Sequence, residues 1–156
     1  MRTLLGNVAL AVGWAALTQF SVANLLLGFV LGYLILGASP SVAQHNTYFL
    51  RGRQLAGFSL FFLKELVLAT LRIAHDVLTP THRMTPAVLA IPLDARTDGE
   101  ITFLALVVSL TPGTLALDVS SDRRVLYIHA MYAADPEAVR RGIKQGFERR
   151  ILELLR

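Results

Sequence analysis

Between Arg2 and Arg51 the sequence contains no Asp, Glu, Lys or Arg. A helix needs about 20 mainly apolar residues to cross the hydrocarbon core of a bilayer, so a run of this length has room for two such helices. Soluble domains carry charged residues throughout, and an uncharged run this long is typical of a membrane segment. The first third of the chain is therefore limited to structures that lipid tolerates.

The uncharged run divides into two apolar segments, residues 3–20 and 21–38, with Gln19 and Ser21 between them. We predict a transmembrane helical hairpin over residues 1–38. A cleaved signal peptide is the alternative, since its first two regions are a basic residue and an apolar run. The second apolar segment, which follows directly, favours the hairpin.

A GxxxG motif lies in the second segment, at Gly28 and Gly32. Glycines at this spacing let two helix backbones approach closely in lipid. We predict a helix-packing face there, and both glycines are candidates for contact with a partner chain.

Basic residues flank the hairpin, whereas its tip is uncharged: Arg2 precedes the run, and Arg51 and Arg53 follow it. Lys and Arg are enriched in cytoplasmic loops. We therefore predict that both ends of the hairpin, and the chain from residue 84 onward, lie in the cytoplasm.

Residues 39–83 are predicted to form a polar connector and then an amphipathic helix over 56–78. Glu65, Arg72 and Asp76 share one side of this helix. Its other side has apolar residues at helical spacing: Leu63, Leu66, Val67, Thr70, Leu71, Ala74 and Val77. We expect the helix to lie in the membrane interface or against a bundle without crossing, and the three charged residues are candidate partner contacts. The alternative is a helix that crosses the membrane with its charges turned into a protein bundle. The alternative for Arg72 and Asp76 is a solvated i, i+4 salt bridge.

Prolines between residues 79 and 86 mark a boundary, and residues 84–156 are predicted to form a cytoplasmic α+β domain. An apolar strand is expected over Val88–Leu93. Thr97 and Glu100 then fit a capping box, which predicts a buried helix over 98–110.

The helix stops at Pro112-Gly113, the structural corner of the domain. Proline cannot continue a helix, and glycine accepts positive φ at little cost. A phosphate cradle is the weaker interpretation, because the negative end of the helix dipole points at Gly113.

After the corner, Leu115, Leu117 and Val119 alternate with more polar positions, which predicts a half-buried strand. With Ser121-Asp122 at the centre of a hairpin turn, Leu117 falls opposite Leu126 and Leu115 opposite Ile128. A slip of one residue, which would place Val125 and Tyr127 opposite these leucines instead, is the alternative register.

A final helix is predicted from its N-cap Asp135 and the first-turn Pro136. Its apolar stripe consists of Val139, Ile143, Phe147 and Ile151. The predicted fold is thus a membrane α+β protein: a transmembrane hairpin, an amphipathic third helix and a small C-terminal β-α-β-β-α domain.

Functional chemistry is absent from the sequence patterns. The net charge is +4, but basic and acidic residues are interspersed, which argues against nucleic acid and favours lipid. There is no cysteine, and the four histidines lack metal-ligand spacing. We predict no catalytic, metal or cofactor-binding residues and no enzyme.

Five segments together resemble one family: FFLKELVLATLRIAHDVL, IPLD, SLTPGTLALDV, RVLYIHA and DPEAVRRGIKQGFERRIL. They are similar to the small E subunit of the Mrp-type (Mnh) multisubunit sodium/proton antiporter. The resemblance implies an accessory or assembly subunit in a bacterial inner membrane, with the other antiporter subunits as partners. It implies that this chain is not the principal ion-translocating subunit, and it leaves open whether the chain lines an ion path. The alternatives are a freestanding membrane-anchored ligand-binding or enzymatic module and a homodimeric adaptor joined through the GxxxG motif.

Overall fold

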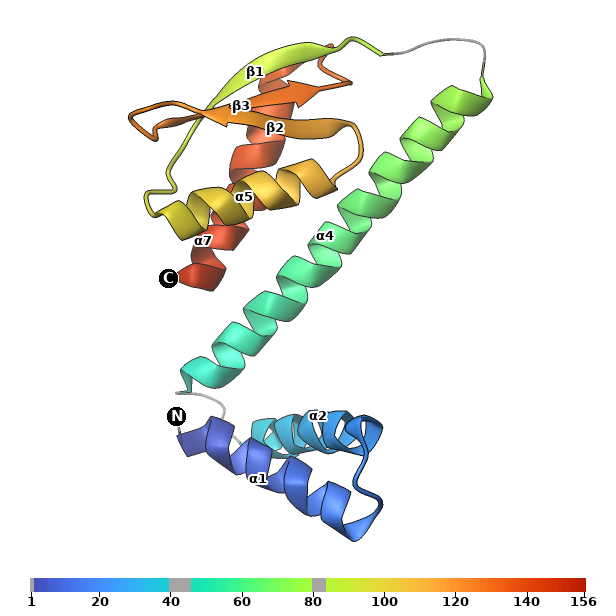
Figure 1. Cartoon of the computed structure of the whole chain (residues 1–156), viewed down its shortest axis with the longest axis vertical. Coiled ribbons are helices and arrows are strands. Elements are labelled where there is room, and N and C mark those ends of the chain that lie inside the picture. The colour runs from blue at the N-terminus through green and yellow to red at the C-terminus, as the bar shows by residue number, and fades with distance from the viewer. Residues whose placement is uncertain (1, 40–45, 80–83) are drawn as a thin grey trace. The chain divides into compact units, whose positions relative to one another are not determined.

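The computed structural model describes residues 2–39, 46–79 and 84–156. Part of the predicted prolyl linker, residues 80–83, lies outside them. The chain forms two compact units, Met1–Arg53 and Gln54–Arg156, which we describe separately (Figure 1).

The first unit contains the predicted hairpin. Helices α1 (Arg2–Leu17) and α2 (Val22–Ala38) are joined by a short turn, and Ser21 caps α2 by accepting a hydrogen bond from the Asn24 backbone N–H at 3.2 Å. Small residues, Ala11 and Ala15 of α1 among them, are buried where the two helices meet. The prediction of a helical hairpin is confirmed.

Helix α4 (Thr47–Leu78) is longer than expected. The predicted start at residue 56 is wrong, and Arg51 and Arg53 lie within the helix. The Asn46 side chain accepts a hydrogen bond from the Tyr48 N–H at 3.1 Å, which satisfies one of the free donors at the helix start. Among the described helices, α4 is the one long and apolar enough to cross a membrane by length and composition, while α1 and α2 are shorter apolar helices.

The second unit contains the predicted strand and helix order around a three-stranded sheet. Strands β1 (Ala87–Pro92) and β2 (Thr114–Val119) both pair antiparallel with β3 (Val125–Ala130), which lies between them. The alternating strand residues Leu89, Ile91, Leu126 and Ile128 are buried on one face. Figure 1 shows α5 beside β2 on that face, with α7 extending past α5 toward the C-terminus.

The predicted register of β2 and β3 is wrong. Leu115 pairs with His129, and an irregularity between Ala116 and Asp118 then shifts the ladder by one residue. The shift is a β-bulge, which places two residues of one strand opposite one of the other. As a result Ala116 and Val119 pack toward the core, whereas Leu115 and Leu117 are exposed.

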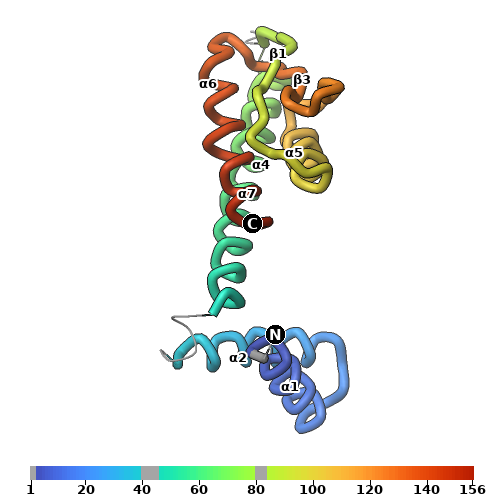
Figure 2. Tube along the Cα trace, turned by 90° about the vertical axis from the view of Figure 1, so that its left-hand side faces the viewer, coloured from blue at the N-terminus to red at the C-terminus, as the bar shows by residue number. Residues whose placement is uncertain are grey.

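Helices cover the inner face of the sheet. Helix α5 (Asp98–Leu110) starts with both hydrogen bonds of the predicted capping box. The last helix begins as α6 (Pro136–Arg141) with the Asp135 cap, passes through the π-helical segment η1 (Gly142–Glu148) and ends as α7 (Arg149–Leu155), as Figure 2 shows. Its predicted stripe is confirmed, since Ile143, Phe147 and Ile151 are buried and Val139 packs against them.

Candidate functional site

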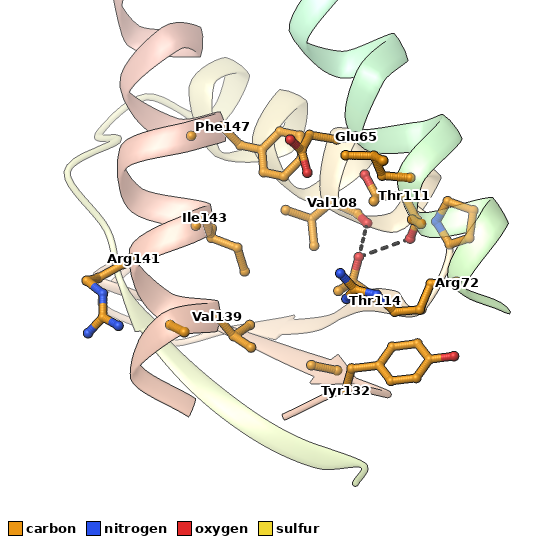
Figure 3. Close-up of a pocket in the computed structure, with 18 of the residues that line it drawn as sticks. Glu65, Arg72, Val108, Thr111, Thr114, Tyr132, Val139, Arg141, Ile143 and Phe147 are labelled. Atoms are coloured by element: carbon orange, nitrogen blue, oxygen red, sulfur yellow. Dashed lines mark hydrogen bonds between the residues drawn. The ribbon is translucent and has the colours of Figure 1, made fainter. Parts of the chain in front are cut away.

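A cavity of about 740 Å³ lies between α4 and the C-terminal domain (Figure 3). Most of its wall comes from α4, the corner at residues 111–114, and α6 with η1, and Val108 of α5 and Ala130 of β3 also line it. Large side chains hold α4 against the domain beside it, because Phe58 lies 5.8 Å from Phe103 and Phe61 lies 5.3 Å from Phe147, measured between ring centroids. The cavity is thus framed by aromatic contacts.

The cavity wall is mainly apolar, with a few polar groups. Val108, Val139 and Ile143 line it, and Glu65 and Arg72 reach it from α4. Pockets of this size with few polar groups are typical of binding sites for small molecules or for side chains of a partner. The arrangement suits recognition of such a ligand or side chain.

Tyr132 connects two of the charged residues of α4. Its Oη donates a hydrogen bond to Asp76 Oδ2 at 2.8 Å, and the Arg72 guanidinium lies 5.4 Å from its ring centroid. His75 Nδ1 is 3.5 Å from Asp76 Oδ1. Burial, together with the hydrogen bond to Asp76, raises the pKa of the Tyr132 phenol, which therefore remains the donor at neutral pH.

Glu65, Arg72 and Asp76 therefore share the side of α4 that faces the C-terminal domain. Asp76 is only 3% exposed, so its carboxylate is held within the chain. Arg72 and Asp76, the pair for which a solvated salt bridge was the alternative, both contact Tyr132. No sequence pattern indicated Tyr132, because it lies just beyond β3 and far from α4 in the sequence.

The corner at Pro112-Gly113 is confirmed. Gly113 has φ +90°, in the region that favours glycine. Thr114 Oγ1 donates hydrogen bonds to the carbonyl oxygens of Val108 at 2.7 Å and Thr111 at 3.0 Å, which satisfies the end of α5. A Cβ on Gly113 would lie 3.5 Å from the Tyr132 ring, so the corner supports the Tyr132 cluster.

Two carboxylates are buried at the end of the domain where β1 stops and the last helix finishes: Glu148, which no sequence pattern indicated, and Glu100, which was predicted only as part of the capping box. Glu148 accepts hydrogen bonds from the backbone N–H groups of Asp94 at 2.6 Å and Ala95 at 2.9 Å. Lys144 Nζ lies 2.6 Å from Glu148 Oε2 and 2.7 Å from Asp94 Oδ2. These contacts fix the last helix to the end of β1.

Glu100 is the second of these carboxylates. It accepts hydrogen bonds from the N–H groups of Arg96 at 2.8 Å and Thr97 at 3.2 Å, and Arg156 Nε lies 2.9 Å away. The bond to Arg156, followed by the two backbone bonds, lowers the pKa of Glu100 from its usual 4.5 to about 2. These contacts give Glu100 a structural role at the start of α5 and at the C-terminus.

In the hairpin, Gly28 and Gly32 of α2 face α1 of the same chain. A Cβ on Gly28 would lie 2.9 Å from the Trp14 Cβ, and a Cβ on Gly32 would collide with the Asn7 side chain. Asn7 is fully buried and donates a hydrogen bond to Tyr48 Oη at 2.6 Å. The motif is thus a packing face, as predicted, with α1 as its neighbour.

Across residues 2–39, 46–79 and 84–156, no three His, Asp or Glu side chains are grouped so that they could hold a metal ion. The polar residues that line the cavity come from α4, from the corner and from the rest of the second unit: Glu65, Arg72, Thr85, Thr111, Thr114, Tyr132, Asp135, Arg141 and Gln145.

The sequence is similar to one family of membrane-transport proteins over almost its whole length. Residues 7–154 match the family model described as MNHE, Na+/H+ ion antiporter subunit. The chain is 36% identical over 154 residues to the E subunit of the Na(+)/H(+) antiporter of Bacillus subtilis, and the match covers 98% of both chains. It is 35% identical over 152 residues to the protein of the same name in Alkalihalophilus pseudofirmus, covering 97% of this chain and 96% of that protein.

Two solved structures share its fold. A chain in the structure of the Mrp complex from Dietzia sp. DQ12-45-1b is 26% identical with a TM-score of 0.51, covering 65% of this chain and 96% of that one. A chain of the archaeal membrane-bound sulfane sulfur reductase has a TM-score of 0.53 at 21% identity and 96% coverage of both chains, which shows likeness of fold alone.

Proposed function

This chain belongs to the MNHE family of Na+/H+ antiporter subunits, and from that membership we propose that it is an accessory and assembly subunit of a multisubunit sodium/proton antiporter. Its partners are the other subunits of the complex. It supports cation/proton exchange without being the principal ion-translocating subunit, and it is not an enzyme.

The observation that carries this proposal is the match over residues 7–154, because it includes the hairpin, α4 and the C-terminal domain together. The relatives named as antiporter subunits are matched over nearly their whole length, so the likeness is not limited to one shared domain. A freestanding ligand-binding module or a homodimeric adaptor would not require relatives of this kind. The geometry agrees, since Gly28 and Gly32 are occupied within the hairpin.

The candidate contacts to other subunits are residues of α4 that line the cavity. Glu65 and Arg72 line the cavity and remain the candidate contacts to another subunit. Asp76 supports them indirectly, because it holds Tyr132 against Arg72. Gly28 and Gly32 support assembly by keeping the hairpin closed.

The hairpin is the proposed membrane anchor, inserted from the cytoplasmic side of a bacterial cell membrane. At about 1.5 Å per residue, helices of this length span roughly 25 Å, slightly less than the ~30 Å hydrocarbon core. Exposed apolar side chains surround both helices, including Leu5, Leu17, Val22 and Ile35. Both ends of the hairpin and the C-terminal domain are placed in the cytoplasm.

Purification of the tagged chain from membranes in mild detergent tests the proposed function. We expect several larger membrane proteins to elute with it in fixed proportion. Elution as a single active species would instead support a freestanding module, and elution as a dimer of this chain would support an adaptor. When substituted forms of the tagged chain are purified in the same way, Gly13→Ala is the control substitution, since nothing lies within 4 Å of the added methyl group.

A further inference from the structure

Helix α4 turns its charged side inward. Asp76 is bonded to Tyr132, Arg72 lies over the same ring, and Glu65 lines the cavity. The Arg150 guanidinium of α7 lies 4.3 Å from the Phe61 ring centroid, on the same side of α4. Charged groups thus follow the domain-facing side of α4 along most of its packed length.

The opposite side of α4 is an apolar stripe with no partner among the described residues. Leu60, Leu63, Val67 and Leu71 are 70%, 54%, 48% and 60% exposed. Three- and four-residue spacing places them on one face with the last turn of the helix. We call this set, completed by Ala74 and Leu78, the outer stripe: Leu60, Leu63, Val67, Leu71, Ala74 and Leu78.

A helix that is charged toward its own domain and apolar toward its surroundings is suited to lipid or to another protein. Helix interfaces inside membranes favour small residues, which the hairpin of this chain illustrates with Gly28 and Gly32 facing α1. The outer stripe has mainly leucine and valine instead. Lys64 is at its edge, 67% exposed, where its ammonium group can reach the headgroups.

The contacts between α4 and the C-terminal domain determine whether α4 can cross the bilayer. Contacts with the domain extend from Phe58 to Asp76, about 27 Å of helix at 1.5 Å per residue. That length of α4 cannot cross the hydrocarbon core, because Arg150, Arg72 and Asp76 would enter it together with the domain. Residues 47–57 alone are too short for a span.

The start of α4 is also fixed. Tyr48 and Phe49 in its first turn bind the hairpin, through the Asn7 bond to Tyr48 Oη and the Tyr33 Oη bond to the Phe49 carbonyl oxygen at 3.3 Å. These bonds join the beginning of α4 to the end of the hairpin where α1 starts and α2 finishes. In the proposed topology, that end lies at the cytoplasmic surface of the bilayer.

We propose that α4 lies along the cytoplasmic surface of the membrane, with the outer stripe inserted among the lipids and the C-terminal domain held on the opposite side. The bilayer is the occupant of this face. The inference depends on insertion of the hairpin and not on the antiporter role, so its failure leaves the co-purification result unaffected.

Depth measurements on α4 test this arrangement. The chain has no cysteine, so single cysteines at positions 60, 63, 67, 71 and 78 can carry nitroxide labels in the full complex in lipid nanodiscs. We expect all five labels at one depth, about 5–10 Å into the headgroup and acyl boundary, accessible to oxygen and protected from a nickel chelate. A label at Ser121 in the exposed loop between β2 and β3 is the control and should be accessible to the nickel chelate.

Two outcomes would overturn the proposal. A depth that changes steadily from position 60 to position 71, by about 16 Å at 1.5 Å per residue, would show that α4 crosses the bilayer. Labels protected from both oxygen and nickel would show that a protein subunit covers the outer stripe.

Discussion

At the scale of single residues, Tyr132 and Gly113 determine how the cavity is built. Gly113 brings the chain round with φ +90° and lies against the Tyr132 ring. Tyr132 then connects Arg72 to Asp76. The positive φ of Gly113 therefore helps to place Tyr132 where it contacts Arg72 and Asp76 of α4.

Gly113→Val should destabilise the second unit by about 1–3 kcal/mol, because a β-branched residue is strained at positive φ. Thermal unfolding of the purified complex would measure the loss. Gly142→Val is the matched control, since Gly142 has φ −59° and no atom lies within 4 Å of an added Cβ. Equal melting temperatures for the two variants would contradict the role of the corner.

Tyr132→Phe and Arg72→Ala should have different effects. Phenylalanine keeps the ring under Arg72 but loses the hydrogen bond to the buried Asp76, which costs about 1.5–3 kcal/mol for a bond to a charged group. Arg72→Ala loses a cation–π contact worth about 0.5–1 kcal/mol at an exposed site, and with it the proposed partner contact. We expect Tyr132→Phe to lower the melting temperature more, and Arg72→Ala to lower co-purification of the larger subunits more. The reverse order would place the partner contact elsewhere.

The pKa of Glu100 makes the stability of the domain depend on acid. Because folding lowers this pKa from 4.5 to about 2, the contribution of Glu100 to stability is complete above pH 4.5 and is lost as the pH falls toward 2. Glu100→Gln keeps a residue able to complete the capping box but cannot titrate. The variant should therefore lose less stability than the wild type between pH 5 and pH 2, as measured by denaturant unfolding at each pH. If the free energy of unfolding falls equally in the two proteins between pH 5 and pH 2, the titration of Glu100 does not contribute to the acid sensitivity of the domain.

At the scale of elements, the sequence predicted what depends on local signals. The capping box at Thr97, the stop at Pro112 and the cap at Asp135 each involve only a few neighbouring residues, and each is present. The start of α4 at Thr47 was missed, although Asn46 precedes it as a capping residue: its side chain accepts a hydrogen bond from the Tyr48 N–H, and its carbonyl oxygen accepts one from the Phe49 N–H.

Long-range features were harder to predict. The β-bulge near Leu117 changes which residues of β2 face inward, and alternation alone cannot reveal an extra residue in one strand. The Glu148 and Arg156 contacts join residues more than fifty positions from their partners. One weak signal was available: the final stripe repeats every four residues from Val139 to Ile151, a wider spacing than the 3.6 of an α-helix, and the π-helical segment accounts for it.

Gly32→Ala should open the hairpin, because a Cβ there collides with the Asn7 side chain and the helices must separate. Overpacking of this kind typically costs about 1–3 kcal/mol. The amount of chain retained in membranes should fall relative to Gly13→Ala, whose added methyl group meets no atom within 4 Å. Equal retention would show that α1 and α2 tolerate a wider spacing.

At the scale of the whole molecule, an uncharged hairpin is combined with a domain rich in charged contacts. The proposed topology places Arg2, Arg51 and all residues after Met84 in the cytoplasm. A cysteine added after Arg156 should therefore resist an impermeant thiol reagent in intact cells and react after lysis. Labelling of intact cells would exclude a hairpin with both ends inside.

The strand order β1-β3-β2 has a consequence for synthesis. Strand β1 leaves the ribosome first, but its partner β3 is completed only at Ala130, after α5 and β2. At about 5–20 residues per second, β1 waits several seconds with its backbone unpaired. The hairpin of α1 and α2 is formed by neighbouring segments and needs no such delay, so the membrane anchor can be in place before the domain that it carries has closed its sheet.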